Sequence, residues 1–398
     1  MKTNLKTRAV HAGESPDPTT GASSPNLVMS STFLADPEAS FSAEGSHDDD
    51  SFFYTRWGNP TVAQLEQKLA ALEETEAAMA FASGMAAVTG LFFHCLRPGD
   101  HLILADVVYA AVSEMAGDWL KGIGVEISRV DTSDLESIRG AIRENTKLIY
   151  IETPCNPILR LTDIAAVASL AKSAGARLAV DSTFATPIAT QPAKLGADFV
   201  VHSLTKYIGG HGDAIGGSIA GPADDIAEIR KKVGIRMGSI ISPFNAWLIL
   251  RGMATLPIRM QAHESAAKEV ANFLENHSAI SRVIYPGLES HPQHELAKSQ
   301  MANFSGILTF QTPHHAVLPK IFSEKLQIVH YAVSLGHHRS LIFYIPTDEI
   351  LSTSFSLTES QEENYRNFAG DAVFRLSVGI EDAADICEDL DRALSGVT

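Results

Sequence analysis

Short apolar runs alternate with amphipathic stretches through the first two thirds of the chain. Segments such as Asp163–Ala174 place apolar residues at the three- and four-residue spacing of a helix. The apolar runs, which predict strands, are Ala77–Phe81, His101–Ala105, Val125–Val130, Leu148–Glu152, Arg177–Asp181 and Phe199–His202. This alternation predicts an α/β protein whose mostly parallel central sheet is covered by helices on both faces.

The pattern changes at both ends of the chain. Residues 1–58 are rich in Ser, Pro, Gly and Asp and predict an irregular arm, with Glu44 to Ser51 as a solvated acidic loop. Asn59 and Pro60 mark the start of the first helix, because proline is favourable at the first helical position. Past residue 255, a helix and two strands are expected at Met260–Asn276, Gly306–Phe310 and Val373–Val378. We therefore expect an arm over 1–58, a large domain over 59–255 and a smaller C-terminal α+β domain over 256–398.

Composition and charge narrow the choice of partners. Of the 398 residues, 45% are hydrophobic and 20% are charged, which is typical of a globular enzyme. The formal net charge of −16 repels nucleic acids and anionic membrane surfaces, so neither is an expected partner. The N-terminal segment lacks the apolar stretch of a signal peptide, and no run is long and apolar enough to span a bilayer. We expect a cytoplasmic protein.

Motifs for nucleotides and metals are missing. Gly210-His211-Gly212 lacks the third glycine of a dinucleotide-binding loop, and the chain has no P-loop. Neither His291-Pro-Gln-His294-Glu295 nor the His337-His338 pair matches a zinc-protease pattern, so no metal site is expected. The cysteines are far apart and form no Cys-x-x-Cys pair, which predicts reduced thiols at Cys95, Cys155 and Cys387.

Lys206 is the best candidate for covalent chemistry. It follows an apolar run and lies among hydroxyls and glycines, with Ser203 and Thr205 close before it. A lysine held in a pocket loses its proton and condenses with an aldehyde to form a Schiff base, and the hydroxyls nearby suit an anionic group. Asp181 ends another apolar run, where its carboxylate either caps the next turn or keeps a pyridine nitrogen protonated. Both residues are expected where ligands bind, beyond the carboxyl ends of the strands.

Four segments together resemble the Cys/Met-metabolism enzymes that depend on pyridoxal phosphate. The segments are residues 54–61, 152–157, 180–187 and 202–211, and the resemblance extends from Thr7 to the C-terminus. It implies the aspartate-aminotransferase-like fold, fold type I, with pyridoxal 5′-phosphate (PLP) as cofactor. It also implies a homo-oligomer, expected to be a tetramer of two dimers, in which each active site draws on two subunits.

The resemblance assigns roles to individual residues. Lys206 matches the Schiff-base lysine, and Asp181 matches the partner of the ring nitrogen. The remaining cofactor contacts that it implies are Gly84, Met85, Ser203 and Thr205 on the phosphate, Tyr54 and Arg56 from the neighbouring subunit, and Thr183. Tyr109 matches an aromatic residue that stacks on the ring and takes part in proton transfer, although a lone tyrosine is more often a packing residue.

The substrate is expected to meet a second group of residues. Arg375 matches the guanidinium that binds the substrate α-carboxylate, a role that suits its planar pair of donors. Without the resemblance, Arg375 would be interpreted as a salt-bridge residue. Ser334 and Asn156 match positions close to that carboxylate and a cofactor oxygen. Arg339 stands where the cystathionine enzymes carry a glutamate, which weakens the case for cystathionine; it either meets an anionic tail or points into solvent.

The chain departs from the family pattern at two further places. Ala110-Ala111 and Tyr344-Ile345-Pro346-Thr347 replace residues that are common in the family, so the substrate is the least determined part of the assignment. The leading hypothesis is a carbon–sulfur lyase of the methionine γ-lyase type that releases 2-oxobutanoate, ammonia and a thiol. The alternatives are γ-replacement on O-succinyl- or O-acetylhomoserine by a sulfhydrylase or cystathionine γ-synthase, a cystathionine lyase, and a non-catalytic binding protein that retains the fold.

Overall fold

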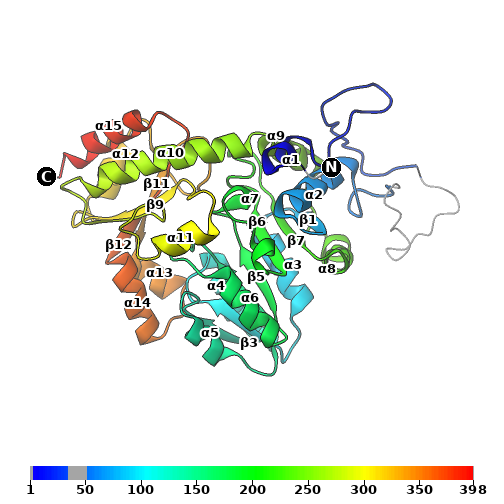
Figure 1. Cartoon of the computed structure of the whole chain (residues 1–398), viewed down its shortest axis with the longest axis horizontal. Coiled ribbons are helices and arrows are strands. Elements are labelled where there is room, and N and C mark those ends of the chain that lie inside the picture. The colour runs from blue at the N-terminus through cyan, green and yellow to red at the C-terminus, as the bar shows by residue number, and fades with distance from the viewer. Residues whose placement is uncertain (1–2, 35–51, 398) are drawn as a thin grey trace.

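The computed structural model of the chain describes residues 3–34 and 52–397. Within them the chain forms a seven-stranded sheet and a five-stranded sheet, joined by the long helix α10 (Leu256–Glu275). In Figure 1 the large sheet with its helices lies below and to the right of α10, and the small sheet lies at the end that carries the C-terminus. No helix among the described residues is long and apolar enough to cross a membrane. The expected acidic loop at Glu44 to Ser51 lies outside the described residues.

The large sheet is mostly parallel. Its strand order is β1-β7-β6-β5-β4-β2-β3, and β7 alone of these described strands runs antiparallel to its neighbours β1 and β6. The strands are β1 (Ala77–Phe81), β2 (His101–Ala105), β3 (Glu126–Val130), β4 (Thr146–Glu152), β5 (Arg177–Asp181), β6 (Phe199–Ser203) and β7 (Gly217–Gly221). The predicted α/β fold class is confirmed.

Helices cover both faces of this sheet, as the apolar pattern predicted. Alternate residues of each strand point to opposite faces, so Met79 and Phe81 pack with α3 while Ala78 and Ala80 pack with α2 and α9. The helices of this part are α1 (Leu5–His11), α2 (Pro60–Glu73), α3 (Gly84–Cys95), α4 (Ala110–Met115), α5 (Leu135–Ala141), α6 (Ile164–Ser173), α7 (Thr186–Ala189), α8 (Ala223–Ile229) and α9 (Pro243–Met253). A 3₁₀ turn at Pro192–Leu195 and π-helical turns at Ala116–Leu120 and Arg230–Ile235 complete it.

The small sheet has the order β10-β11-β12-β9-β8 and is mostly antiparallel. One face packs against α10, α12 and α15 through Phe310, Phe374 and their neighbours. Its strands are β8 (Arg282–Ile284), β9 (Ile307–Gln311), β10 (His330–Tyr331), β11 (Leu341–Pro346) and β12 (Ala372–Ser377). Its further helices are α11 (His294–Gln300), α12 (Leu318–Lys325), α13 (Thr347–Thr353), α14 (Glu359–Ala369) and α15 (Ala383–Leu394).

The expectation of an irregular arm is wrong at one place, because α1 is helical. This helix is too short to show a periodic pattern, and its stability comes from packing. Ala9 is buried in the same cluster as the apolar side of α2, and Arg8 donates hydrogen bonds to the Ala71 carbonyl (2.7 Å) and to Glu74 (2.6 Å). The division at residues 58 and 255 remains a prediction.

Candidate active site

A cavity of about 820 Å³ lies beyond the carboxyl ends of β4, β5 and β6. These ends bring Glu152, Asp181 and Ser203 to its floor, as expected for an open parallel sheet. The small sheet supplies another wall through Phe343 of β11 and Arg375 of β12. The predicted residues that line the cavity are Gly84, Met85, Tyr109, Asn156, Asp181, Thr183, Ser203, Thr205, Lys206, Ser334 and Arg375.

Lys206 lies in the turn directly after β6, with its side chain largely removed from solvent. Its Nζ donates a hydrogen bond to Ser334 Oγ at 2.9 Å. Burial lowers the pKa of Lys206 to about 8, and the charge of Arg375 adds to the effect, because both disfavour a second cation in the cavity. An appreciable fraction of the amine is therefore neutral near neutral pH, which is the form that attacks a carbonyl.

Two carboxyl groups lie side by side at the floor of the cavity. Glu152 and Asp181 are register partners on β4 and β5. Asp181 accepts hydrogen bonds from the Thr183 amide (3.0 Å) and the Tyr150 hydroxyl (3.1 Å). Burial raises the pKa of Asp181 above its ordinary value, because nothing nearby compensates its charge fully. Such a carboxyl suits a cationic partner that would restore its charge.

Glu152 is a site residue that the sequence analysis did not single out. Its oxygens accept hydrogen bonds from the amides of Tyr109 (2.7 Å) and Asn156 (2.8 Å), so it positions two predicted site residues. Burial, together with the neighbouring Asp181, raises the pKa of Glu152 to about 8. The signal available in the sequence was a carboxylate at the end of an apolar run, at Glu152 as at Asp181.

The turn between β1 and α3 approaches the lysine turn very closely. A Cβ atom placed on Gly84 would lie 2.9 Å from Ser203 Cβ, so only glycine fits here. Gly84 is the first residue of the twelve-residue helix α3, whose N-terminus faces the cavity together with Ser203 and Thr205. Amides at a helix N-terminus and hydroxyls attract an anion, so this cradle fits a phosphate. With Lys206 and Asp181 close by, the residues present fit PLP.

Arg375 is buried, and no carboxylate among the described residues forms an ion pair with it. Its Nη1 donates to Asn156 Oδ1 at 2.8 Å, and its Nη2 donates to the Ser334 carbonyl at 3.1 Å. Its Nε has no hydrogen-bond partner among the described residues, and burial lowers the pKa of Arg375 to about 10. A desolvated guanidinium of this kind favours an anionic ligand, which agrees with the expected role toward a substrate carboxylate.

Tyr109 and Ser334 lie at the edges of the cavity. Tyr109 precedes α4, and its side chain is 49% exposed, so its ring is free to cover a ligand. Ser334 adopts a φ of +92°, a conformation that is costly for any residue except glycine. Such backbone strain is common at functional sites, where it holds a side chain in a required orientation. Here it accompanies the hydrogen bond from Lys206 Nζ to Ser334 Oγ.

Three of the predicted residues do not line this cavity. Arg339 is exposed and is not among the residues that line it, and its role toward a substrate tail stays a prediction. Tyr54 is 41% exposed, and the Arg56 guanidinium lies 5.4 Å from the centre of its ring. Arg56 also donates a hydrogen bond to the Ile235 carbonyl. This arrangement leaves both side chains available to another copy of the chain.

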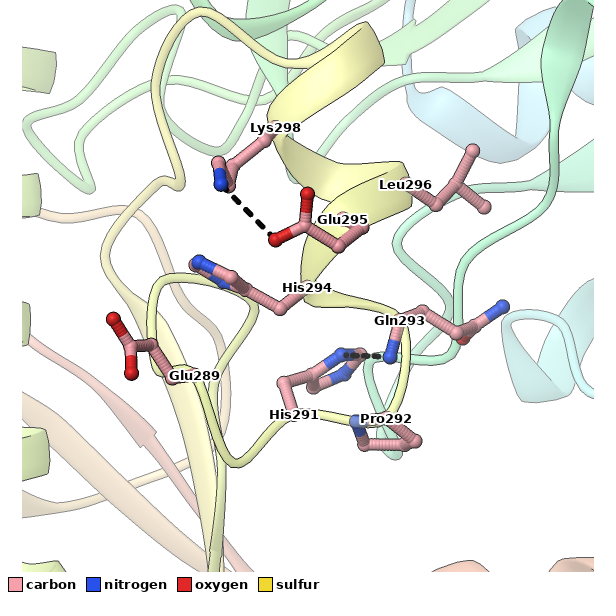
Figure 2. Close-up of a pocket in the computed structure, with 8 residues that line it drawn as sticks. All are labelled: Glu289, His291, Pro292, Gln293, His294, Glu295, Leu296 and Lys298. Carbon is pink, nitrogen blue, oxygen red and sulfur yellow. Dashed lines mark hydrogen bonds and ion pairs between the residues drawn. The ribbon is translucent and has the colours of Figure 1, made fainter.

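The histidine-rich turn before α11 forms a separate surface pocket, shown in Figure 2. His291 donates from Nε2 to the Leu159 carbonyl (3.1 Å), and its Nδ1 accepts from the Gln293 amide (3.1 Å). Lys298 pairs with Glu295 at 3.0 Å. Within the described residues, no group of three or more ligating side chains is placed to hold a metal ion. Hydrogen bonds from His291 and Gln293 connect the turn to the 159–161 segment.

Comparisons with known proteins agree with this geometry. Residues 6–395 match the model of the family described as Cys/Met metabolism PLP-dependent enzyme. The chain is 40% identical to L-methionine gamma-lyase of Porphyromonas gingivalis, over 100% of this chain and 98% of that protein. It is also 40% identical to cystathionine gamma-synthase of Mycobacterium bovis, over 98% of this chain and 96% of that protein.

A solved structure shows the same fold. The crystal structure of metB from Corynebacterium glutamicum superposes with a TM-score of 0.90 at 37% identity, covering 100% of this chain and 99% of that one. The matched region includes both sheets and every residue of the cavity described above. The chain therefore belongs to the Cys/Met-metabolism family of PLP-dependent enzymes and is a trans-sulfuration enzyme with pyridoxal 5′-phosphate as its cofactor.

Proposed function

We propose that this protein is a carbon–sulfur lyase that carries out γ-elimination on L-methionine or a related thioether amino acid, with release of 2-oxobutanoate, ammonia and a thiol. The chemistry of the cavity wall carries this proposal. The wall built by β11, α13 and the preceding loop is largely apolar, with Val333, Phe343, Ile345, Pro346 and Ile350. Among the described residues that line the cavity, the cations are Lys206 and Arg375. Such a wall suits an uncharged thioether tail and offers no further cation to an anionic one.

The cofactor would be held by residues from several elements. Gly84, Met85, Ser203 and Thr205 would bind its phosphate, Asp181 its ring nitrogen and Lys206 its aldehyde carbon, with Tyr109 and Thr183 beside the ring. When bound, PLP withdraws electrons from the substrate α-carbon and so makes the α-proton acidic. The protein's task is then to orient the amino acid and to move protons.

Three side chains would perform that task. Arg375, with Asn156 and Ser334 around it, would bind the α-carboxylate and fix the orientation of the substrate. Lys206, freed by the incoming amino group, would take the α-proton, and its pKa of about 8 suits a base that works near neutral pH. Tyr109, half exposed over the cavity, would supply a proton to the departing sulfur.

Two other reactions fit parts of the same cavity. An O-acetyl ester is also uncharged, so γ-replacement on O-acetylhomoserine remains the second candidate, in line with the likeness to a cystathionine gamma-synthase. Cystathionine carries a distal ammonium group, and Glu349 is a carboxylate on the cavity wall that could meet it. Arg339 is exposed and does not line the cavity of this chain, so it gives no support to a substrate with an anionic tail.

A substrate panel separates these reactions. The holoenzyme is incubated with L-methionine, L-cystathionine, O-acetyl-L-homoserine or O-succinyl-L-homoserine, each with and without sulfide or cysteine. We expect 2-oxobutanoate and a thiol from methionine without any added thiol, and little reaction with the succinyl ester. Formation of homocysteine or cystathionine from an acylhomoserine, with no oxo acid from any substrate, would show that the protein is a transferase instead.

We also propose that the active site is shared between subunits of a homo-oligomer, a tetramer of two dimers. Tyr54 and Arg56 would bind the cofactor phosphate of the neighbouring subunit. Their place outside this chain's own cavity, together with the exposure of Tyr54, supports this proposal. In a two-fold dimer each subunit would give its pair to the other's site and receive one in return.

Subunit mixing tests this shared site. Arg56→Ala and Lys206→Ala should each be nearly inactive alone, because one lacks a phosphate ligand and the other lacks the base. A mixed pair of the two variants contains one site with both residues intact, so activity should return on co-expression. Differently tagged subunits allow the mixed oligomer to be purified and verified. A verified mixed oligomer without activity would contradict the shared site.

A further inference from the structure

Three polar side chains form a row that leads away from the cavity at Lys206. Lys206 Nζ donates to Ser334 Oγ at 2.9 Å, and Ser334 Oγ lies 3.2 Å from His337 Nε2. His337 is half-buried, whereas it is not among the residues that line the cavity. It therefore lies behind Ser334, and this hydroxyl links it to Lys206.

The turn that carries His337 is fixed against the lysine turn. The Gly336 amide donates to Ser377 Oγ at 2.9 Å, and the His338 amide donates to the Gly210 carbonyl at 3.0 Å. A Cβ atom on Gly336 would lie 2.6 Å from the Tyr207 amide nitrogen, so the two turns are in direct backbone contact. The row of side chains is thus held by backbone hydrogen bonds on both sides of His337.

A glycine leaves room for the His337 ring at the edge that faces away from Ser334. A Cβ atom on Gly212 would lie 2.8 Å from both Cε1 and Nδ1 of His337. Gly212 has a φ of +72° and is exposed, as are its neighbours His211 and Asp213. The Nδ1 edge of the imidazole thus faces a solvated turn, while its Nε2 edge faces Ser334.

The charges around His337 favour its neutral form. Burial lowers the pKa of His337 below its ordinary value, the Lys206 cation and the neighbouring His338 add to this, and the Asp213 carboxylate on the lysine turn opposes it. In the tautomer protonated at Nδ1, a neutral imidazole accepts the Ser334 hydroxyl proton at Nε2. Ser334 Oγ then keeps its lone pairs for the Lys206 N–H group.

We propose that His337 is a positioning residue that relays protons between Lys206 and solvent through Ser334. One ammonium proton passes from Nζ to Ser334 Oγ as the serine's own proton passes to His337 Nε2. His337 Nδ1 then releases its proton to water at the exposed Gly212 turn. The net result is a neutral amine on Lys206, one proton in solvent and a His337 imidazole protonated at Nε2 instead of Nδ1. The reverse path recharges the amine and restores the Nδ1 tautomer.

This inference rests on the proposed function, in which γ-elimination removes protons from two adjacent substrate carbons. A base that serves both carbons must become neutral again between the two steps. A path that leads out behind the lysine allows this while substrate fills the cavity, because His337 does not line that cavity.

The first test measures proton transfer by the holoenzyme without any elimination. L-Alanine has no γ-substituent, so exchange of its α-proton in D₂O, followed by NMR, reports the base alone. In His337→Gln the amide oxygen can accept from Ser334 but cannot take up a proton, so we expect exchange to slow by about ten-fold.

We also expect the His337→Gln variant to lose the acid limb of the wild-type pH profile of exchange, which reflects protonation of His337. The matched control His338→Gln retains the His337 imidazole, so it should keep the rate and keep an acid limb, which moves upward as the influence of His338 on His337 is lost. An unchanged rate and profile in His337→Gln would overturn the proposal.

The second test does not depend on activity. In the cofactor-free full chain, reaction of His337 with diethyl pyrocarbonate, followed by peptide mass spectrometry across pH, gives the pKa of its imidazole. We expect this pKa to rise in Lys206→Met, because the opposing cation is gone. An unchanged pKa would contradict the proposed link between Lys206 and His337, and this result does not require His337→Gln to fold. Slow exchange in His337→Gln alongside a wild type that releases no 2-oxobutanoate would retain the relay and reject the lyase.

Discussion

Replacing Lys206 with alanine should reduce turnover of every substrate by about 10⁴-fold, because loss of a positioned base alone costs about 10²–10⁴-fold and the covalent attachment is lost with it. Within the described part of the chain, the side chain donates a hydrogen bond to Ser334 Oγ, and its burial as a cation is unfavourable. The variant should therefore fold and melt like the wild type. Release of product from the best substrate of the panel, measured under saturating PLP, checks the prediction.

Two matched variants isolate the role of the amine. Lys206→Arg keeps a cation in the cavity but has no nucleophilic amine, so it should be as inactive as the alanine variant. Lys172→Ala removes an exposed lysine from α6 and should leave turnover unchanged. Substantial turnover by Lys206→Arg would show that this site supplies only charge.

Replacing Asp181 with asparagine should lower kcat by about 10²–10³-fold, the size of effect seen when one preorganised electrostatic contact is lost. The amide keeps an oxygen for the Thr183 amide, which Asp181 contacts at 3.0 Å, but it carries no charge. Without that charge a pyridine nitrogen in the cavity is not held protonated, and the cofactor withdraws electrons less strongly. The expected loss is in kcat, while the thermal stability should stay close to that of the wild type.

The control residue for this prediction, Asp198, lies at the amino end of β6, whereas the cavity lies at the carboxyl ends of the strands. Asp198 precedes β6, accepts from the Leu178 amide at 2.8 Å and pairs with the partly exposed Arg177. Asp198→Asn removes an aspartate charge far from the cavity and should change kcat by less than about two-fold, since exposed ion pairs contribute little. Equal losses in both variants would point to a general structural effect instead of a role at the ring nitrogen.

Much of the large sheet was predictable because its strands are buried on both faces. Runs such as Arg177–Asp181 and His101–Ala105 are apolar throughout apart from their ends, and they coincide with β5 and β2. The same logic placed Asp181 and Lys206 at the carboxyl ends of neighbouring strands, where the structure brings them to one cavity. Local pattern was sufficient here, since parallel strands end at a common edge.

Strand β7 escaped prediction for a physical reason. Its sequence, Gly217–Gly221, begins and ends with glycine, because a Cβ on Gly217 would lie 2.2 Å from the Ser83 carbonyl oxygen and one on Gly221 would lie 2.8 Å from the Phe199 ring. Because these contacts require glycine at both ends of β7, the segment lacks the apolar run from which a strand is predicted. The contact that requires glycine is invisible until the chain is folded.

Parts of the site were unpredictable for a related reason. The Arg375 contact with Asn156 Oδ1 joins residues that are far apart in sequence, and the roles of Glu152 and His337 depend on which atoms they face. The exposure of Arg339 likewise follows from the fold of the loop before β11 and not from its spacing to Ser334. Motif spacing identifies candidate site residues, whereas the tertiary structure determines which atoms their side chains face.

The central claim is that Lys206 holds the cofactor, and borohydride reduction tests it most directly. Treating the holoenzyme with sodium borohydride makes the bond between lysine and PLP permanent, and peptide mass spectrometry then locates the phosphopyridoxyl group. We predict the label on the peptide that contains Lys206, in wild type and in the Arg375→Ala variant alike. A label on any other lysine, with Lys206 unmodified in active enzyme, would contradict the account.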